Sequence, residues 1–336
     1  MTETPQVPGE LREALVHLLA DGEFHSGAQL GRALGVSRTA VWKALRRLEE
    51  VGVELHAVPK RGYRFAQPIE VLDAETIRAA LPAPARKRTR QIERFLSLPS
   101  TNTHLLERAA PPAGSSDVCV VEAQTAGRGR RGRAWTAPFG GALCLSMNWL
   151  FPDVPRQLSA LSLAVGVGVL RALRSRGACD IRLKWPNDML FAGRKLGGIL
   201  IELRAEFSGP AYVVVGVGLN YRLTPGSKRA LQAAGIEAAD LHEALGEALP
   251  GRNELAATLV SEIGAVLVEF QEQGLKPFSR EWREADALAA SAARVSYGEH
   301  TYGGIARGID EEGALLLETP HQLLRFTSGE VSVRPG

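Results

Sequence analysis

Three shortages in the sequence each exclude a class of protein. Only three cysteines occur, Cys119, Cys144 and Cys179, and their odd number and spacing exclude a disulfide framework and a cysteine-bound metal. No run of 18 apolar residues occurs and no apolar stretch follows a basic start, so we expect neither a transmembrane span nor a signal peptide. The sequence therefore predicts a cytoplasmic protein without a membrane partner, in which the two cysteines of strand-like runs are buried thiols.

The chain also lacks a large excess of either charge. Its 40 lysines and arginines oppose 37 aspartates and glutamates, so any contact with nucleic acid must be local. A length of 336 residues is too great for one ordinary core and predicts two or three domains. A composition of 45% hydrophobic and 23% charged residues is typical of globular proteins.

The most unusual stretch lies between Glu122 and Trp135 and mixes glycine with arginine. It holds Gly127, Gly129 and Gly132 among Arg128, Arg130, Arg131 and Arg133. Glycines let the backbone approach a ligand closely, exposed N–H groups form an anion-binding concavity, and guanidinium groups pair with carboxylate or phosphate. Because the stretch is short and lies between two strand-like runs, we expect a phosphate or carboxylate site. A flexible basic loop that touches RNA and a solvated surface run are the alternatives.

The first 67 residues follow the pattern of a helix-turn-helix. Leucines recur at helical spacing from Leu11 to Leu19, Ser26 precedes a second helix, and Ser37 is placed to cap a third, from about Arg38 to Glu50. Two short strands around a basic turn then predict a β-wing. The side chains expected to face DNA are Arg38, Thr39, Lys43, Arg46 and Arg47 on the helix and Lys60 and Arg61 on the wing. A solvated basic face is the alternative.

Further blocks place polar or cationic residues at the ends of predicted strands. These blocks are Ser100-Thr101-Asn102, Gln124, Lys184–Asp188, Arg194–Leu203 and Gly216–Asn220. Helix capping and a turn after the proline explain the first and third without any ligand. Two adjacent glycines in the fourth instead indicate close approach of a ligand to the strand that Lys195 enters. The basic run Arg86–Arg90 is expected to be a solvated hinge.

Together with the glycine–arginine stretch, these blocks have the order found in biotin–protein ligases, and the chain resembles the bifunctional members of that family over nearly its whole length. The resemblance implies an α+β multidomain fold. Its expected parts are a winged helix-turn-helix domain at 1–67, a mixed α/β ligase domain of the class II synthetase type at 68–287, and an SH3-like β-barrel at 288–336. Regular strands parted by glycine turns after residue 293 agree with a small barrel.

The resemblance further implies an ATP-dependent ligase that makes biotinyl-5′-AMP and transfers biotin to a lysine of biotin carboxyl carrier protein. It implies a repressor of biotin synthesis genes that binds operator DNA as a homodimer when the adenylate is bound. ATP, Mg²⁺ and biotin are the implied small molecules, with no metal ligand assigned. The implied biotin-binding residues are Ser100, Thr101, Asn102, Gln124, Gly127, Arg128, Gly129, Arg130 and Lys195. The implied adenylate or phosphate residues are Arg130, Arg133, Trp135, Asn187, Asp188 and Asn220, and the catalytic ones are Arg130, Lys184, Lys195 and Asp188.

One departure from the family concerns the cover over adenine. Relatives supply an aromatic residue there, but no aromatic residue occurs between Arg222 and Leu249, and Ile236 is a possible apolar substitute. Three other functions stay open. They are a ligand-sensing regulator without catalysis, a lipoate or octanoyl ligase on the same scaffold, and a ligase whose N-terminal domain no longer regulates.

Overall fold

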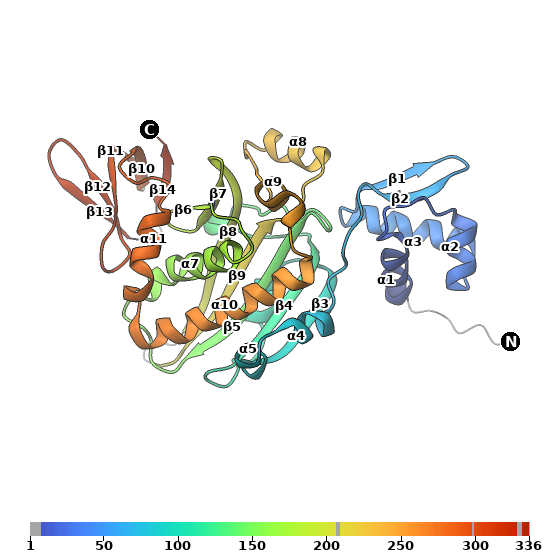
Figure 1. Cartoon of the computed structure of the whole chain (residues 1–336), viewed down its shortest axis with the longest axis horizontal. Coiled ribbons are helices and arrows are strands. Elements are labelled where there is room, and N and C mark those ends of the chain that lie inside the picture. The colour runs from blue at the N-terminus through green and yellow to red at the C-terminus, as the bar shows by residue number, and fades with distance from the viewer. Residues whose placement is uncertain (1–7, 206–208, 298, 328–330, 336) are drawn as a thin grey trace.

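A computed structural model describes residues 8–205, 209–297, 299–327 and 331–335. Residues 1–7 and parts of two predicted C-terminal turns, Gly298 and residues 328–330, lie outside the described residues. Figure 1 shows a small helical part at the N-terminal end, a large central sheet flanked by helices, and a second sheet at the C-terminal end. Among the described residues, no helix combines the length and the apolarity needed to cross a bilayer.

The N-terminal part confirms the predicted helix-turn-helix and wing. Its elements are α1 Pro8–Leu19, α2 Gly27–Leu34, α3 Arg38–Glu50, β1 Leu55–Val58 and β2 Gly62–Phe65. Ser26 and Gln29 form a reciprocal capping box, Gly35 ends α2 in the left-handed region at φ 65°, and Ser37 caps α3. The local signals of the sequence therefore fix the angle at which α3 leaves α2.

A linking segment contains two short helices, α4 Ala74–Ala80 and α5 Ala83–Arg88. The expected solvated hinge at Arg86–Arg90 is wrong, because the run ends α5 and begins a strand of the central sheet. Arg86 donates to the carbonyls of Ala79 and Leu81 and so terminates α4. The charge of this run serves backbone capping as well as solvation.

The central sheet has seven strands in the order β3-β4-β5-β9-β8-β7-β6. Their bounds are β3 Thr89–Leu98, β4 Ser116–Gln124, β5 Ala142–Phe151, β6 Arg182–Lys184, β7 Asp188–Phe191, β8 Arg194–Ala205 and β9 Ala211–Asn220. Only β3 and β4 run parallel; the other described pairs are antiparallel. Asp188, which was expected to complete a turn, begins the short strand β7.

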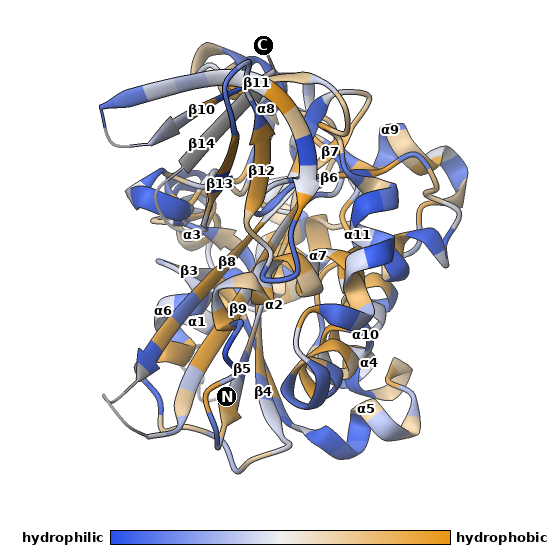
Figure 2. Ribbon diagram, turned by 90° about the vertical axis from the view of Figure 1, so that its left-hand side faces the viewer, coloured by the Kyte–Doolittle hydropathy of each residue, from blue (hydrophilic) through white to orange (hydrophobic). Residues whose placement is uncertain are grey.

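Helices cover both faces of the sheet. Successive side chains of a strand point to opposite faces, and apolar side chains lie on both. Val118 and Val120 face the core under α7 Leu161–Arg174 and α10 Arg252–Gln273, while Cys119 packs with Leu105 of α6 Thr101–Leu106 on the other face. The remaining helices are α8 Pro225–Ala233, α9 Leu241–Leu245 and α11 Ser279–Ala285. Figure 2 shows the apolar residues gathered along the central strands and the inner sides of α7 and α10. Cys119 and Cys144 are buried as predicted, and burial raises the pKa of the Cys144 thiol to about 11.

The C-terminal part is an antiparallel sheet of five strands in the order β13-β12-β11-β10-β14. Their bounds are β10 Ala292–Tyr297, β11 His300–Ile309, β12 Leu315–Glu318, β13 Leu323–Phe326 and β14 Val331–Pro335. The regular strands predicted after residue 293 are present. No described pairing joins the outer strands β13 and β14, so closure into an SH3-like barrel stays a prediction.

Candidate functional site

One cavity of about 1160 Å³ collects residues from segments that are far apart in the sequence. It is bounded by the start of α6, the loop between β4 and β5, the β6–β7 turn, β8, β9 and the segment after α8. The predicted ligase residues that line it are Ser100, Thr101, Asn102, Gln124, Arg128, Gly129, Arg130, Arg133, Trp135, Lys184, Asn187, Asp188, Lys195 and Asn220. The volume is large enough for a ligand bigger than an ordinary drug-sized molecule.

Gly127, the remaining predicted residue, holds the loop rather than lining the cavity. Its carbonyl accepts from Trp135 N at 2.8 Å, and a Cβ added to Gly127 would lie 2.4 Å from the Trp135 carbonyl. Gly129 N donates to the Arg133 carbonyl at 2.7 Å, and Arg131 takes φ 58° between them. The loop therefore folds back on itself and presents its arginines from a tight turn.

One end of the cavity, here called the neutral end, is lined mainly by amide and hydroxyl groups, and its two charged neighbours, Glu202 and Arg128, pair with each other at 2.9 Å. Thr101 N donates to Gln124 Oε1 at 2.9 Å, and Asn102 Nδ2 donates to Glu202 Oε2 at 2.9 Å. The buried Ser146 hydroxyl lies 2.6 Å from Asn102 Oδ1. Ser100 caps α6, as the structural explanation of the sequence expected. Fixed amides and hydroxyls of both polarities suit a neutral ligand that carries a carbonyl beside N–H groups.

The floor beside this network contains two glycines of β9, whose missing side chains leave room for Asn102 and Trp135. A Cβ on Gly216 would lie 2.2 Å from Asn102 Oδ1, and a Cβ on Gly218 would lie 2.6 Å from the Trp135 indole. Both contacts are far below a normal van der Waals separation. The glycines therefore let Asn102 and Trp135 pack directly on the strand.

Replacing Gly216 with alanine is expected to raise KM for the ligand of this end by about 10- to 100-fold, because the methyl group displaces the hydrogen-bonded amide of Asn102. The change in kcat at saturation should be much smaller. Steady-state kinetics against ligand concentration measure both. Gly264→Ala in α10 is the matched control, since its Cβ makes only an ordinary contact at 3.9 Å. Equal KM values for the two variants would contradict this assignment of the floor.

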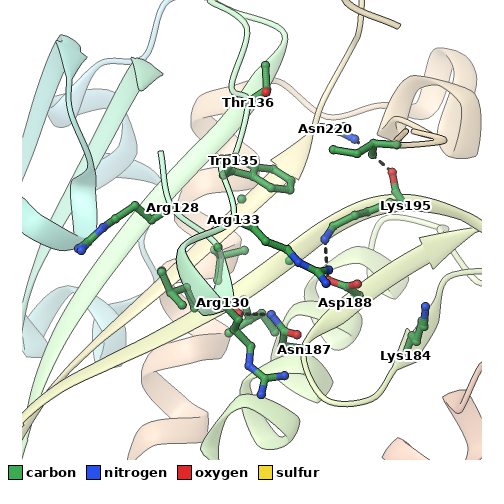
Figure 3. Close-up of a pocket in the computed structure, with 18 of the residues that line it drawn as sticks. Arg128, Arg130, Arg133, Trp135, Thr136, Lys184, Asn187, Asp188, Lys195 and Asn220 are labelled. Carbon is green, nitrogen blue, oxygen red and sulfur yellow. Dashed lines mark hydrogen bonds and ion pairs between the residues drawn. The ribbon is translucent and has the colours of Figure 1, made fainter. Parts of the chain in front are cut away.

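The opposite end of the cavity is cationic. Lys195 Nζ lies 2.8 Å from Asp188 Oδ1, as Figure 3 shows, and 5.8 Å from the centroid of the Trp135 ring. Lys184 lines the same region from β6. Burial, more than its arginine neighbours, lowers the pKa of Arg130, and its Nη2 has no partner within the described residues. A guanidinium still carries its charge at neutral pH, so this end presents positive charge to an anion.

Arg128 serves the neutral end instead. Its Nη2 donates to Thr103 Oγ1 at 2.8 Å and lies 2.9 Å from Glu202 Oε1. Figure 3 shows its side chain turned away from the Lys195–Asp188 pair. Glu202 therefore joins Asn102 and Arg128. No role was expected of Glu202 from the sequence, because its position in a strand offered no separate signal.

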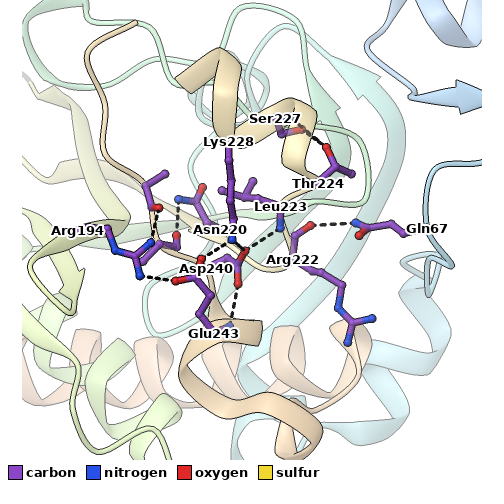
Figure 4. A network of polar contacts seen from close by, with 12 residues as sticks. Gln67, Arg194, Asn220, Arg222, Leu223, Thr224, Ser227, Lys228, Asp240 and Glu243 are labelled. Atoms are coloured by element: carbon purple, nitrogen blue, oxygen red, sulfur yellow. Dashed lines mark hydrogen bonds and ion pairs between the residues drawn. The ribbon is translucent and has the colours of Figure 1, made fainter. Parts of the chain in front are cut away.

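The rim after β9 is fastened by a second polar network (Figure 4). Lys228 of α8 pairs with Asp240 at 3.0 Å and with Glu243, which also pairs with Arg194. Asn220 Nδ2 donates to the carbonyls of Lys195 and Ala239, so this predicted ligand residue also ties the rim to β8. Among the rim residues that line the cavity are Leu231 and Ile236. Ile236 thus lines the cavity, and its role as a cover over adenine stays a prediction.

Two further sets of residues line the cavity and were not expected from the sequence. Arg182 lies two residues before Lys184 in β6, and the two-residue period of a strand could have placed both on one face. Asp286, Ala287 and Leu288 follow α11 and reach the cavity because Ala287 N donates to the Leu183 carbonyl at 2.8 Å. Such a pairing between distant segments leaves no local signal.

The predicted DNA-facing side chains form a second candidate site. Those of α3 and the wing, Arg38, Thr39, Lys43, Arg46, Lys60 and Arg61, are all exposed. Gly62 takes φ 109°, and a Cβ there would lie 2.1 Å from the His25 carbonyl, so the wing pairs closely with the segment before α2. The Arg61 guanidinium lies 4.2 Å from the centroid of the Phe24 ring. The wing is thus anchored beside α3, with its basic tip exposed.

Family models match three parts of the chain. The biotin/lipoate A/B protein ligase family matches residues 95–220, an HTH domain matches residues 11–64, and the biotin protein ligase C terminal domain matches residues 294–334. The bifunctional ligase/repressor BirA of Salmonella typhimurium is 40% identical over 320 residues, which cover 95% of this chain and 96% of that protein. This chain belongs to the BirA family of bifunctional ligase/repressors.

Two further relatives and one solved structure are also similar to this chain. BirA of Bacillus subtilis is 31% identical, with coverage of 96% of this chain and 98% of that protein. The biotin–[acetyl-CoA-carboxylase] ligase of Mycobacterium tuberculosis is 36% identical over 72% of this chain and 88% of that protein. The solved Aquifex aeolicus biotin protein ligase in complex with biotin and ATP superposes with a TM-score of 0.61 at 26% identity. It covers 74% of this chain and 100% of that one.

Proposed function

We propose that this protein activates biotin with ATP to biotinyl-5′-AMP, transfers the biotinyl group to a lysine of a biotin carrier protein, and represses transcription through its N-terminal domain. One observation carries the ligase half. Arg130, Lys184 and Lys195 come from three separate segments and line a single cavity whose other end is a neutral hydrogen-bonding network.

The neutral end suits the bicyclic ring of biotin. The ureido carbonyl and its two N–H groups would exchange hydrogen bonds with the group formed by Thr101, Asn102 and Gln124. The ring would lie against Asn102 and the Trp135 indole, which pack on β9 at Gly216 and Gly218. This placement directs the valerate carboxylate toward Lys195.

The first step joins two anions. The valerate carboxylate attacks the α-phosphorus of ATP, an O–P bond forms, and pyrophosphate leaves. Arg130, Lys184 and Lys195 would offset the repulsion and stabilise the charge on the phosphorus, because preorganised cations act strongly where water is excluded. Arg182 and Arg133 would extend the cationic lining toward the outer phosphates.

Mg²⁺ fits this site as a companion of ATP rather than as a resident ion. Within the described residues no three His, Cys, Asp or Glu side chains group as metal ligands, but Mg²⁺ commonly binds through one or two protein oxygens plus substrate phosphates. Asp188 and Asn187 would supply those oxygens beside the cationic end. The ion would add positive charge to the triphosphate.

In the second step the ε-amine of the acceptor lysine attacks the carbonyl carbon of the adenylate, a C–N bond forms, and AMP leaves. The amine must lose a proton, and three carboxylates line the cavity: Asp188, Glu237 and Asp286. Of these three carboxylates, Asp188 lies beside Lys195 at the cationic end, so we assign it the role of accepting the proton of the amine. The folded glycine–arginine loop would keep water from hydrolysing the mixed anhydride.

Coupling between adenylate and DNA follows from contacts between the two parts. Glu54, beside the wing, accepts from Thr224 Oγ1 at 2.6 Å and from Ser227 Oγ at 2.8 Å at the start of α8. Gln67 Nε2 donates to the Arg222 carbonyl at 3.0 Å (Figure 4). Since the far end of α8 lines the cavity, ligand at the rim would bias the DNA-binding domain. A homodimer formed by the adenylate-bound protein would place two such domains on paired half-sites.

Replacing Arg130 with glycine tests the ligase assignment. We expect slower labelling of the carrier protein from biotin and ATP, or early release of the adenylate, because a partly buried cation is lost from the phosphate end. Arg156→Gly, at an exposed position outside the cavity, is the control. An Arg130 variant with unchanged rate and unchanged adenylate retention would remove this residue from the site.

The alternatives separate in the same assay. A regulator without catalysis would bind biotin and ATP but leave the carrier unlabelled. A lipoate or octanoyl ligase would prefer those acids in a substrate panel, whereas the ureido-compatible network favours biotin. We further propose that the protein acts in the cytoplasm. In this proposal the C-terminal sheet closes into an SH3-like barrel, and the central domain is of the class II synthetase type.

A further inference from the structure

The helix assigned to DNA carries one large apolar side chain that the fold leaves uncovered. Trp42 of α3 is 49% exposed, while Val41, Ala44 and Leu45 are buried against α1 and α2. Exposing apolar area of this size is unfavourable by about 25 cal/mol per Å². Single exposed apolar side chains are common on protein surfaces, but this indole lies on the polar face of the helix that the helix-turn-helix pattern directs at DNA.

The same domain shows what a covered aromatic ring looks like. Phe24 has the guanidinium groups of Arg61 and Arg64 at 4.2 and 4.9 Å from its ring centroid. Trp42 has a single such neighbour, Arg46, at 5.9 Å. The arginines close over Phe24 but not over Trp42.

The surroundings of Trp42 select the class of partner. From Arg38 to Leu48 the helix carries four basic side chains and no acidic one. Arg38 and Arg46 lie one turn before and after Trp42, so the indole is flanked by cations along one side of the helix. Glu49, which lies 3.8 Å from Arg46, comes only at the end of α3. A polyanion fits this face, whereas an apolar protein surface would leave the cations unpaired.

The position of Trp42 along α3 indicates which part of a nucleic acid the indole would contact. Ser37 caps α3, and Trp42 lies in its second turn. When a recognition helix enters the major groove, residues near its N-terminus reach the base edges. Thymine is the base that presents an apolar group there, its C5-methyl, while the other groups of the groove are hydrogen-bond donors and acceptors.

We propose that Trp42 determines part of the DNA sequence preference by packing its indole against a thymine C5-methyl in the major groove. The inference rests on the proposed repressor function and adds a specific contact to it. Arg38 and Lys43 hold the helix on the phosphates or bases, and the indole discriminates between bases. Trp42 thus contributes to specificity, and the exposed cations contribute most of the salt-dependent affinity.

The experiment uses the full-length protein with biotin, ATP and Mg²⁺ present. Preferred duplexes are first selected from a random pool with the wild-type chain. Trp42→Ala is then expected to weaken binding to the selected duplex by about 5- to 100-fold, with no change for random-sequence DNA. The slope of log affinity against log salt concentration should be unchanged, because no phosphate contact is lost. Trp42→Phe should retain most of the preference.

Uracil substitution locates the contact. Replacing the thymines of the selected duplex with uracil one at a time removes single methyl groups. One position should weaken the wild-type protein several-fold and leave Trp42→Ala unaffected, as expected of a double-mutant cycle. Carrier labelling by the same variants checks that they are folded, since Trp42 does not line the ligase cavity.

The possible results distinguish failure of the repressor proposal from failure of the role proposed for Trp42. If the wild-type protein selects no DNA sequence, the repressor proposal fails and this inference fails with it. If it selects a sequence but Trp42→Ala binds that sequence equally well, with the same uracil sensitivity, only the role of Trp42 is overturned. If Trp42→Ala weakens self-association measured by sedimentation and leaves the affinity of the dimer for DNA unchanged, Trp42 contacts protein and the inference is wrong.

Discussion

Lys195→Met is expected to lower kcat for adenylate formation by about 10²- to 10³-fold, the usual effect of removing one preorganised charged donor from a developing negative charge. Methionine is an unbranched side chain only one atom shorter than lysine, so the substitution mainly removes the charge and its donors. The ammonium lies between Asp188 and the Trp135 ring, so its position is fixed before substrates arrive. Biotin-dependent exchange between ATP and pyrophosphate measures the step directly.

The control for this prediction is Lys87→Met, which changes an exposed lysine of α5 far from the cavity lining. It should exchange at the wild-type rate. Transfer from chemically made biotinyl-AMP should suffer less than adenylate formation in Lys195→Met, because the repulsive first step is bypassed. A decrease of less than about tenfold in exchange would show that Lys195 contributes little to the charge balance.

Arg252→Ala is expected to lower the free energy of unfolding by about 3–5 kcal/mol. Arg252 and Glu122 are 0% and 1% exposed and form a salt bridge beneath the cavity loop. The guanidinium also donates to the carbonyls of Glu70 and Ala142, at 2.9 and 3.0 Å, and Glu122 accepts from Leu72 N at 2.6 Å. Removing the arginine leaves a buried carboxylate and two carbonyls without their partners. Urea unfolding of the central domain gives the value.

A surface pair supplies the comparison. Arg307 and Glu318 of the C-terminal sheet are each about half exposed, and Arg307→Ala should cost less than about 1 kcal/mol. The double variant Arg252→Met with Glu122→Leu should recover stability relative to Arg252→Ala, because no charge is then buried unpaired. Similar losses for the buried and the surface arginine would mean that water reaches the Glu122 carboxylate.

Local signals in the sequence predicted the winged helix-turn-helix well. Ser26 and Ser37 are caps with few competing explanations, and the apolar period of α3 places Val41, Leu45 and Leu48 inward, where the structure has them. The ligase blocks were recognisable because each combines glycine with charge at a strand end. The resemblance to a family then implied that they meet, and the cavity brings those residues together.

What the sequence could not supply are pairings over long distances. The approach of Ala287 to Leu183 and the salt bridge of Glu202 with Arg128 each depend on where another segment lies. Trp42 was overlooked for a different reason. An aromatic residue at a helical position is ordinarily part of the core, and only its exposure in the folded structure shows otherwise.

The central claim is that cationic side chains from separate segments meet around the two reacting acids, the carboxylate of biotin and the phosphates of ATP. A crystal structure of the protein with a non-hydrolysable analogue of biotinyl-AMP tests this claim most directly. We predict that the phosphate oxygens lie about 2.7–3.0 Å from donors of Arg130, Lys184 or Lys195, with the ureido ring at Asn102 and Gln124. A phosphate bound in solvent, with these three side chains directed elsewhere, would contradict the proposed ligase site.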